Sequence, residues 1–133
     1  GQKLLTVADH MHAGEDNPVI PEGKTVRDAL FVITAKGLGA TSVVTREGTL
    51  TGLITDGDIR RGFARGNDFL DLRVEEFMTR APKTIAADQL AAAALHRMET
   101  NQPSPITVLP VIDGQGRSVG MVHITDLLRR GMV

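Results

Sequence analysis

The sequence predicts an α/β (α+β) fold built from two repeats, each roughly β-α-β-β-α, that pack with pseudo-two-fold symmetry. Two similar stretches, residues 52–62 and 120–130, each read as an apolar strand that turns into a helix. The segments before them also repeat, because Val-Glu-Glu-Phe-Met at 74–78 answers Val-Ala-Asp-His-Met at 7–11. Halves of a 133-residue chain are too small to bury much surface alone, so we expect them to pack face to face.

The two stretches share polar residues where the strand gives way to the helix. A helix start leaves backbone N–H groups without intrahelical partners, and the helix dipole adds positive charge there. Glycine and aspartate can serve at this point only to shape a turn and cap the helix, or they can form a site for a ligand with phosphate and hydroxyl groups. The duplication favours the second interpretation. The coinciding pairs are Gly52 with Gly120, Asp58 with Asp126, and Arg61 with Arg129.

Local signals predict the elements of the first half. Residues 4–11 read as a linker with a helical turn, and residues 18–20 as a brief strand. Thr25 should cap a helix whose apolar residues recur at i, i+3, i+4 and i+7 from Val26, and Gly37 should end it. The remaining elements are strands at 41–45 and 50–55, joined by a turn at 46–49, and a helix at 58–65.

The second half repeats this order. A helix from about 88 to 100 carries Leu90, Ala94 and Met98 on one side, and prolines follow it. Strands at 108–113 and 119–125 flank a turn at 114–117, and a helix is expected at 126–130. The predicted domain boundaries are 1–17 for an N-terminal segment and linker, 18–66 for the first repeat, 67–81 for a linker between the repeats, and 82–133 for the second repeat.

Composition excludes several classes of protein. Aromatic residues make up 3%, without Trp or Tyr, and the net charge is −1. Because a basic stripe and an aromatic platform are both missing, we expect no nucleic-acid partner. The chain has no Cys, which removes disulfides and thiolate metal sites and agrees with a cytoplasmic setting. No apolar run approaches the length of about 18 residues that a membrane span needs, so we expect no membrane partner.

Both repeats end in Gly-apolar-apolar-x-x-x-Asp-apolar, and with this order of elements they resemble a pair of CBS motifs, or Bateman module. The resemblance covers residues 4–131. It implies a regulatory module that needs no cofactor. Such modules bind adenosine nucleotides or related small-molecule effectors in the cleft between the repeats, and they pass the signal to an attached enzyme or transporter.

A narrower resemblance implies a particular parent protein. Residues 5–11, 36–39, 55–61, 78–85 and 122–131 look like the C-terminal CBS pair of bacterial arabinose 5-phosphate isomerase. In that family an N-terminal sugar-isomerase (SIS) domain interconverts ribulose 5-phosphate and arabinose 5-phosphate, which feeds synthesis of the lipopolysaccharide sugar Kdo. The resemblance implies a fragment without the catalytic domain and without catalytic residues of its own. It also implies an adenosine nucleotide or a CMP-Kdo-type effector, a homodimer of CBS pairs, and a tetramer in the parent protein.

The family pattern also implies roles for individual residues. In nucleotide-binding CBS motifs the Asp that opens the second helix holds the ribose diol, and a Thr or Ser three residues earlier contacts phosphate. The matching residues are Asp58 and Thr55 in the first repeat, and Asp126 and His123 in the second. A carboxylate accepts two hydroxyl protons and a hydroxyl donates to phosphate, so the chemistry agrees. His123 departs from the general motif: it either donates to phosphate, with a charge that depends on pH, or is a hydrogen-bonded cleft residue without a ligand.

Other residues are less specific candidates. Arg60, Arg61 and Arg129 either contact phosphate or form solvated helix faces. The resemblance implies that Thr79 and Lys83 line the base pocket, mainly through backbone atoms.

His10 and His12 have a spacing that could hold a metal ion. Only Glu15 and Asp16 stand near them in sequence, so a flexible linker is favoured and no metal is expected.

Three functions therefore compete. The first is a ligand-sensing regulatory module. The second is a structural module that holds subunits together through helices such as residues 26–33 and binds no small molecule. The third, an independent enzyme, lacks a set of residues that would support its chemistry.

Overall fold

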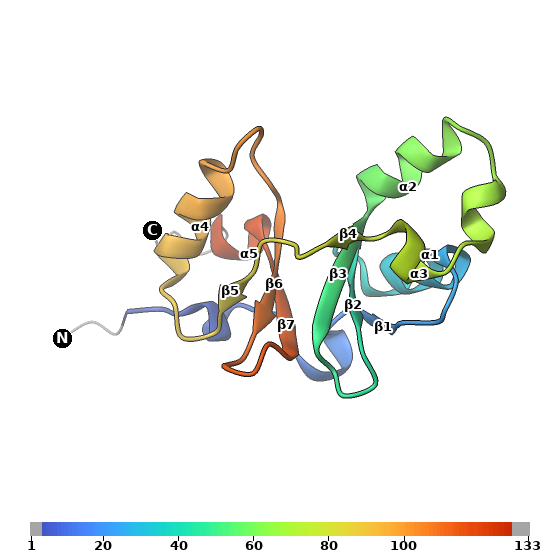
Figure 1. Ribbon diagram of the computed structural model, residues 1–133. Coiled ribbons are helices and arrows are strands. Elements are labelled where there is room, and N and C mark those ends of the chain that lie inside the picture. The colour runs from blue at the N-terminus through green and yellow to red at the C-terminus, as the bar shows by residue number, and fades with distance from the viewer. Residues whose placement is uncertain (1–3, 129–133) are drawn as a thin grey trace. The chain divides into compact units, whose positions relative to one another are not determined.

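A computed structural model of the protein describes residues 4–128. It has the mixed α and β fold that the sequence predicts, with one four-stranded and one three-stranded sheet. The chain divides into two compact units. We call residues 18–82 and 115–118 the first-repeat unit, and residues 4–17, 83–114 and 119–128 the second-repeat unit. In Figure 1 the labels β1 to β4 mark the sheet of the first-repeat unit, and β5 to β7 mark that of the second.

The sheet of the first-repeat unit has the strand order β1-β2-β3-β4. Strand β1 pairs in parallel with β2, whereas β2 with β3 and β3 with β4 are antiparallel. The predicted hairpin between β2 and β3 is confirmed, and Gly48 adopts the positive φ of 88° that its turn requires. The strands are β1 (Val19–Pro21), β2 (Ala40–Val44), β3 (Leu50–Thr55) and β4 (Thr79–Arg80).

Four helical segments belong to this unit, and α1 is the one that the sequence specifies most fully. Thr25 caps it through a hydrogen bond from the Asp28 N–H, and Gly37 ends it at a left-handed φ of 75°, as predicted. Its buried Val26, Ala29 and Ile33 pack against buried side chains of the strands. The segments are α1 (Val26–Lys36), α2 (Asp56–Phe63), the 3₁₀ turn η3 (Asp68–Asp71) and α3 (Val74–Phe77).

The sheet of the second-repeat unit has the order β5-β6-β7, with β5 parallel to β6. Figure 1 shows α4 and α5 beside one another against this sheet. The core gathers Ala94 and Met98 of α4, Leu109 of β6 and Val122 of β7. The elements are η1 (Val7–Asp9), η2 (Gly14–Asp16), β5 (Ile85–Ala86), α4 (Ala91–Glu99), β6 (Val108–Ile112), β7 (Ser118–His123) and α5 (Ile124–Leu128).

Three predicted helix boundaries were wrong. Helix α2 begins at Asp56 rather than residue 58, because Thr55 is its N-cap. Helix α5 begins at Ile124 rather than residue 126, and residues 129 and 130 of the predicted helix lie outside the described residues. Helix α4 spans Ala91–Glu99, so Leu90 is its N-cap residue and is 42% exposed rather than part of the buried side.

Both segments for which the sequence predicted linkers pack into a unit. Residues 67–81 contain η3, α3 and β4, and they bury Leu70 and Val74 in the core of the first-repeat unit. The N-terminal segment buries Val7 completely in the core of the second-repeat unit. The sequence did not predict this packing, because apolar residues spaced this widely show neither a helical nor a strand period. Each of these residues is nevertheless buried in a core.

Candidate functional site

In the first repeat, three of the predicted site residues meet at the start of α2. The Thr55 hydroxyl accepts a hydrogen bond from the Asp58 N–H (3.2 Å), and Asp58 Oδ2 accepts one from the Thr55 N–H (3.0 Å). This reciprocal pair is a capping box, which fixes both side chains on the backbone. Arg61, one turn along the helix, donates from Nη2 to Asp58 Oδ1 at 2.7 Å.

The helix start is therefore less open than expected for a bare anion site. The Asp56 N–H donates to the carbonyl oxygen of Gly39 (2.9 Å), and the Asp58 N–H donates to Thr55. Two of the N–H groups that the helix leaves unpaired thus have partners in the protein itself. Side-chain groups remain available to a ligand, because the Asp58 side chain is 21% exposed and that of Arg61 is 73% exposed.

The second repeat builds a related arrangement at the start of α5. Asp126 Oδ2 accepts from the His123 N–H (3.0 Å), as Asp58 does from Thr55. The same oxygen lies 2.9 Å from Nε2 of His12, and the side chains of His12 and Asp126 are 34% and 15% exposed. Because a carboxylate only accepts, His12 Nε2 must be the donor.

His123 occupies the place of Thr55 and caps its own turn. Its Nδ1 accepts from the Thr125 N–H (3.2 Å) and lies 2.9 Å from the Thr125 hydroxyl oxygen. A neutral imidazole that accepts at Nδ1 carries its proton at Nε2. His123 therefore keeps a donor on the outer side of its ring, which suits contact with phosphate as well as contact with water.

The repeated glycines serve close packing rather than ligand contact. A Cβ on Gly52 would lie 2.6 Å from Cγ of Met78, and a Cβ on Gly120 would lie 2.8 Å from Sδ of Met11. Each glycine thus leaves room for the methionine that ends one of the repeated Val…Met segments. For the two glycines, the structural interpretation is therefore favoured over a role in ligand binding.

The other predicted site residues do not gather at these carboxylates through any described hydrogen bond. Arg60 and Thr79 are exposed, and Thr79, which lies in β4, pairs with Leu53 of β3. Lys83 is exposed and donates to Asn101 Oδ1. Arg129 lies outside the described residues.

His12 is the residue that sequence reasoning missed. Its spacing from His10 predicts at most a metal ligand, yet His12 pairs with Met121 as an isolated strand bridge and contacts Asp126. The repeat itself held a signal, because aligning residues 7–11 with 74–78 places His12 opposite Thr79. Within residues 4–128, no three His, Cys, Asp or Glu side chains converge to hold a metal ion.

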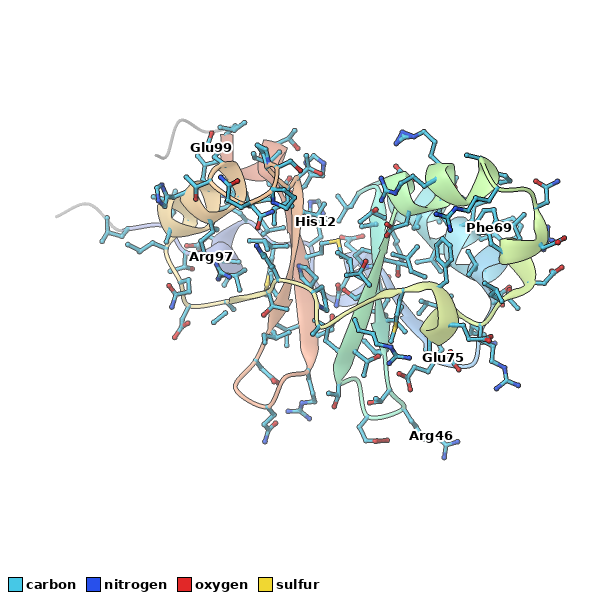
Figure 2. The ribbon with its side chains drawn as sticks, turned by 45° about the horizontal axis from the view of Figure 1, so that its top comes forward. His12, Arg46, Phe69, Glu75, Arg97 and Glu99 are labelled. Atoms are coloured by element: carbon cyan, nitrogen blue, oxygen red, sulfur yellow. The ribbon has the colours of Figure 1, made fainter. Side chains whose placement is uncertain are left out.

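A groove of about 350 Å³ adjoins the first-repeat site. Its lining includes the charged Asp58, Arg61 and Arg65 and the aromatic Phe69 and Phe77. The two phenyl rings stack with centroids 5.3 Å apart (Phe69 is labelled in Figure 2). A phosphate that approached Asp58 from this groove would meet two guanidinium groups.

Two carboxylates with shifted pKa values lie in the first-repeat unit but outside the site. The pKa of Asp28 is lowered by hydrogen bonds from the Thr25 N–H and then the Thr25 hydroxyl. The pKa of Glu75 is lowered, first by the hydrogen bond from the Gly23 N–H. Both are helix-cap or turn groups, so their shifted pKa values reflect structure rather than chemistry.

Comparison with known proteins identifies relatives of this fold and sequence. Residues 7–65 and 74–132 each match the family described as CBS domain. Arabinose 5-phosphate isomerase KdsD of Pseudomonas aeruginosa is 43% identical over 130 residues, which are 98% of this chain and 39% of that protein. The chain spans about two fifths of the length of the curated relatives it matches.

Solved structures share the fold. The CBS domain pair of protein MJ0100, in complex with 5′-methylthioadenosine and S-adenosyl-L-methionine, has a TM-score of 0.79 and 24% identity over 96% of this chain and 95% of that chain. CBSX2 in complex with AMP has a TM-score of 0.75 and 22% identity over 96% of each chain. At these identities the likeness concerns the fold alone. No helix within residues 4–128 combines the length and apolar character that crossing a membrane demands.

Proposed function

Because the chain belongs to the CBS domain family, we propose that it is a regulatory module that binds a nucleotide or nucleotide-sugar effector at Thr55 and Asp58 and at His123 and Asp126. The observation that carries this proposal is the matched pair of carboxylates, each fixed by a backbone N–H at the start of a helix. The adenosine ligands named for MJ0100 and CBSX2 support this class of effector.

The chemistry of binding follows from the groups present. A vicinal diol can donate both hydroxyl protons to one carboxylate, as the ribose of a nucleotide would to Asp58 or Asp126. The Thr55 hydroxyl or the Nε2–H of His123 then donates to phosphate. Since Arg61 already contacts Asp58, a ligand hydroxyl would share that carboxylate with Arg61 or release the guanidinium toward phosphate.

The similarity to KdsD extends the proposal to a parent protein. In it, an SIS domain would interconvert ribulose 5-phosphate and arabinose 5-phosphate in the cytoplasm for Kdo and lipopolysaccharide synthesis. The effector would be an adenosine nucleotide or CMP-Kdo, an end product of that route. Such an effector changes enzyme output only by binding one arrangement of the parent protein better than another.

A thermal-shift screen of this chain tests the effector proposal. The panel holds AMP, ADP, ATP, S-adenosylmethionine, CMP, CMP-Kdo and arabinose 5-phosphate. A ligand at a hundred times its Kd stabilises a folded protein by about 2.7 kcal/mol when it binds only the folded state. We expect at least one nucleotide to raise Tm, and the Asp58→Asn/Asp126→Asn double variant to abolish the shift.

The matched control is Asp28→Asn, which alters a capping box of the same design away from the site. It should lower the basal Tm but keep the ligand shift. A shift of unchanged size in the double variant would contradict this assignment of the site.

One observation favours a second function, the assembly of subunits. Phe31 on α1 is 70% exposed and Phe63 on α2 is 45% exposed. The prediction that the apolar stripe at residues 26–33 forms the assembly surface is wrong in part. Val26, Ala29 and Ile33 of that stripe are buried within their own unit. A homodimer of this chain, or a tetramer of the parent protein, would therefore use the opposite face of α1, where Phe31 lies.

A further inference from the structure

The N-terminal segment, residues 4–12, is bound along the second-repeat unit before it reaches the candidate site. The side chain of Val7 is fully buried in the core of that unit. Backbone hydrogen bonds fix the segment on both sides of this residue. They run from the Val7 N–H to the Gln89 carbonyl (2.8 Å), from the Ala8 N–H to the Ala87 carbonyl (2.9 Å), and from the Ala91 N–H to the Leu5 carbonyl (2.9 Å).

His12 ends this segment and joins it to Asp126. Its backbone exchanges two hydrogen bonds with Met121, at 2.8 and 3.0 Å. Its Nε2 then reaches Asp126 Oδ2 at 2.9 Å, across 114 positions of sequence (His12 is labelled in Figure 2). The same oxygen takes the His123 N–H, so one atom ties the N-terminal segment to the start of α5.

Within residues 4–128, no side-chain hydrogen bond joins Asp58 of the first repeat to a distant segment in this way. The position that corresponds to His12 is Thr79, which is exposed in β4. The side-chain partner of Asp58 is Arg61, three residues away on the same helix. A ligand that displaced Arg61 or Thr55 from Asp58 would disturb only the end of β3 and the start of α2. One that displaced His12 from Asp126 would disturb residues 4–12.

We propose that His12 is a positioning residue that couples occupation of Asp126 to the N-terminal segment, and this rests on the proposed function of Asp126 as an effector contact. A ligand hydroxyl that donates to Asp126 Oδ2 competes with His12 for the same lone pairs. The competition changes the free energy of holding residues 4–12 against the unit, which is the differential interaction that regulation requires. The second-repeat site can thereby transmit ligand binding to the N-terminal segment, whereas the first-repeat site lacks this connection within the described part of the chain.

The first experiment needs no ligand. Hydrogen exchange at the Val7 and Ala8 amides is measured in the wild type, in Asp126→Asn and in the matched variant Asp58→Asn, with the Leu109 amide as a reference for global unfolding. We expect exchange at Val7 and Ala8 to be about tenfold faster in Asp126→Asn, because losing the acceptor's charge weakens the His12 hydrogen bond enough to change the local opening equilibrium by about this factor. Asp58→Asn should leave it unchanged.

Two further variants separate positioning from simple packing. His12→Ala should speed the exchange at Val7 and Ala8, and His12→Gln should restore protection, because its amide can still donate to Asp126. The ¹⁵N shift of His12 Nε2 should change in Asp126→Asn and stay constant in Asp58→Asn. Unchanged exchange at Val7 and Ala8 in Asp126→Asn would overturn the coupling.

The second experiment adds AMP and CMP as probes. A probe that binds should alter exchange at Val7 and Ala8 in the wild type but not in His12→Ala. Binding without any change in the segment would overturn the coupling and leave the proposed function standing. Failure of both probes to bind would count against the proposed function, while the ligand-free exchange data would still decide the role of His12.

Discussion

In the proposed function, Asp58 and Asp126 would each cap a helix and hold a ligand with one carboxylate. One oxygen holds a backbone N–H at the start of a helix, which contributes to stability as a cap does. That bond also fixes the direction of the remaining lone pairs, so a ligand need not order the side chain when it binds. A residue that caps a helix is therefore well suited to hold a diol, and the two roles do not exclude each other.

Gly52 and Gly120 permit a prediction at the same scale. Gly52→Ala and Gly120→Ala should each lower the free energy of unfolding by about 1 to 3 kcal/mol through overpacking. Gly120→Ala should cost more, because its Cβ would also lie 2.9 Å from the backbone oxygen of His12, which yields less readily than a methionine side chain. Urea denaturation provides the measurement. The control is Gly114→Ala, which has nothing within 4 Å of the new Cβ and should be nearly neutral.

Among the elements, α1 is the one whose stability should depend most clearly on pH. The pKa of Asp28 is lowered from its ordinary value of 3.8 by the Thr25 N–H and hydroxyl. A carboxylate with a lowered pKa contributes stability that is present above its ordinary value and lost as pH falls through the folded value. The urea midpoint of the wild type should therefore be higher than that of Asp28→Asn at about pH 7. The difference between the two midpoints should disappear toward about pH 3.

The control for this series is Asp68→Asn, an exposed position in η3. Its urea midpoint relative to wild type should change little over the same pH range. A gap between wild type and Asp28→Asn that stayed constant with pH would refute the role assigned to Asp28.

How far the sequence predicts each element depends on where its determinants lie. Helix α1 was predicted correctly because Thr25, the apolar stripe and Gly37 are all local. Helices α2 and α5 begin two residues earlier than the aspartates predict, and in α2 this is because Thr55, the last residue of β3, is the N-cap. The roles of both linkers and of His12 depend on partners far along the chain, such as Met121, and no local pattern reports them.

The N-terminal segment gives a second prediction for an element. Val7→Ala should lower the free energy of unfolding by about 2 kcal/mol, because it removes the equivalent of two buried methylene groups. Val7 is 0% exposed, whereas Leu4 is 69% exposed, so Leu4→Ala is the matched control and should change little. Chemical denaturation followed by circular dichroism compares the two. Equal effects would show that the segment is not part of the core in solution.

For the whole molecule, the exposed phenylalanines predict that copies of the chain assemble. All four phenylalanines belong to the first-repeat unit, and Phe31 and Phe63 are exposed there. We expect sedimentation velocity at micromolar concentration to show a dimer, and Phe31→Glu to shift it toward monomer because a charge would be desolvated in the interface. Leu90→Gln, a change at an apolar residue of the second-repeat unit, should not. A wild-type monomer would contradict the assembly role.

The two sequence repeats and the two compact units of the structure have different boundaries. Residues 4–17 complete the second-repeat unit although they precede the first repeat, and residues 115–118 of the second repeat complete the first-repeat unit. Each unit therefore includes residues from the other repeat's part of the sequence, so neither repeat alone contains all the residues of one unit. A chain cut between residues 65 and 74 would separate residues 4–17 from the unit that they complete, so the two repeats should not fold as independent fragments.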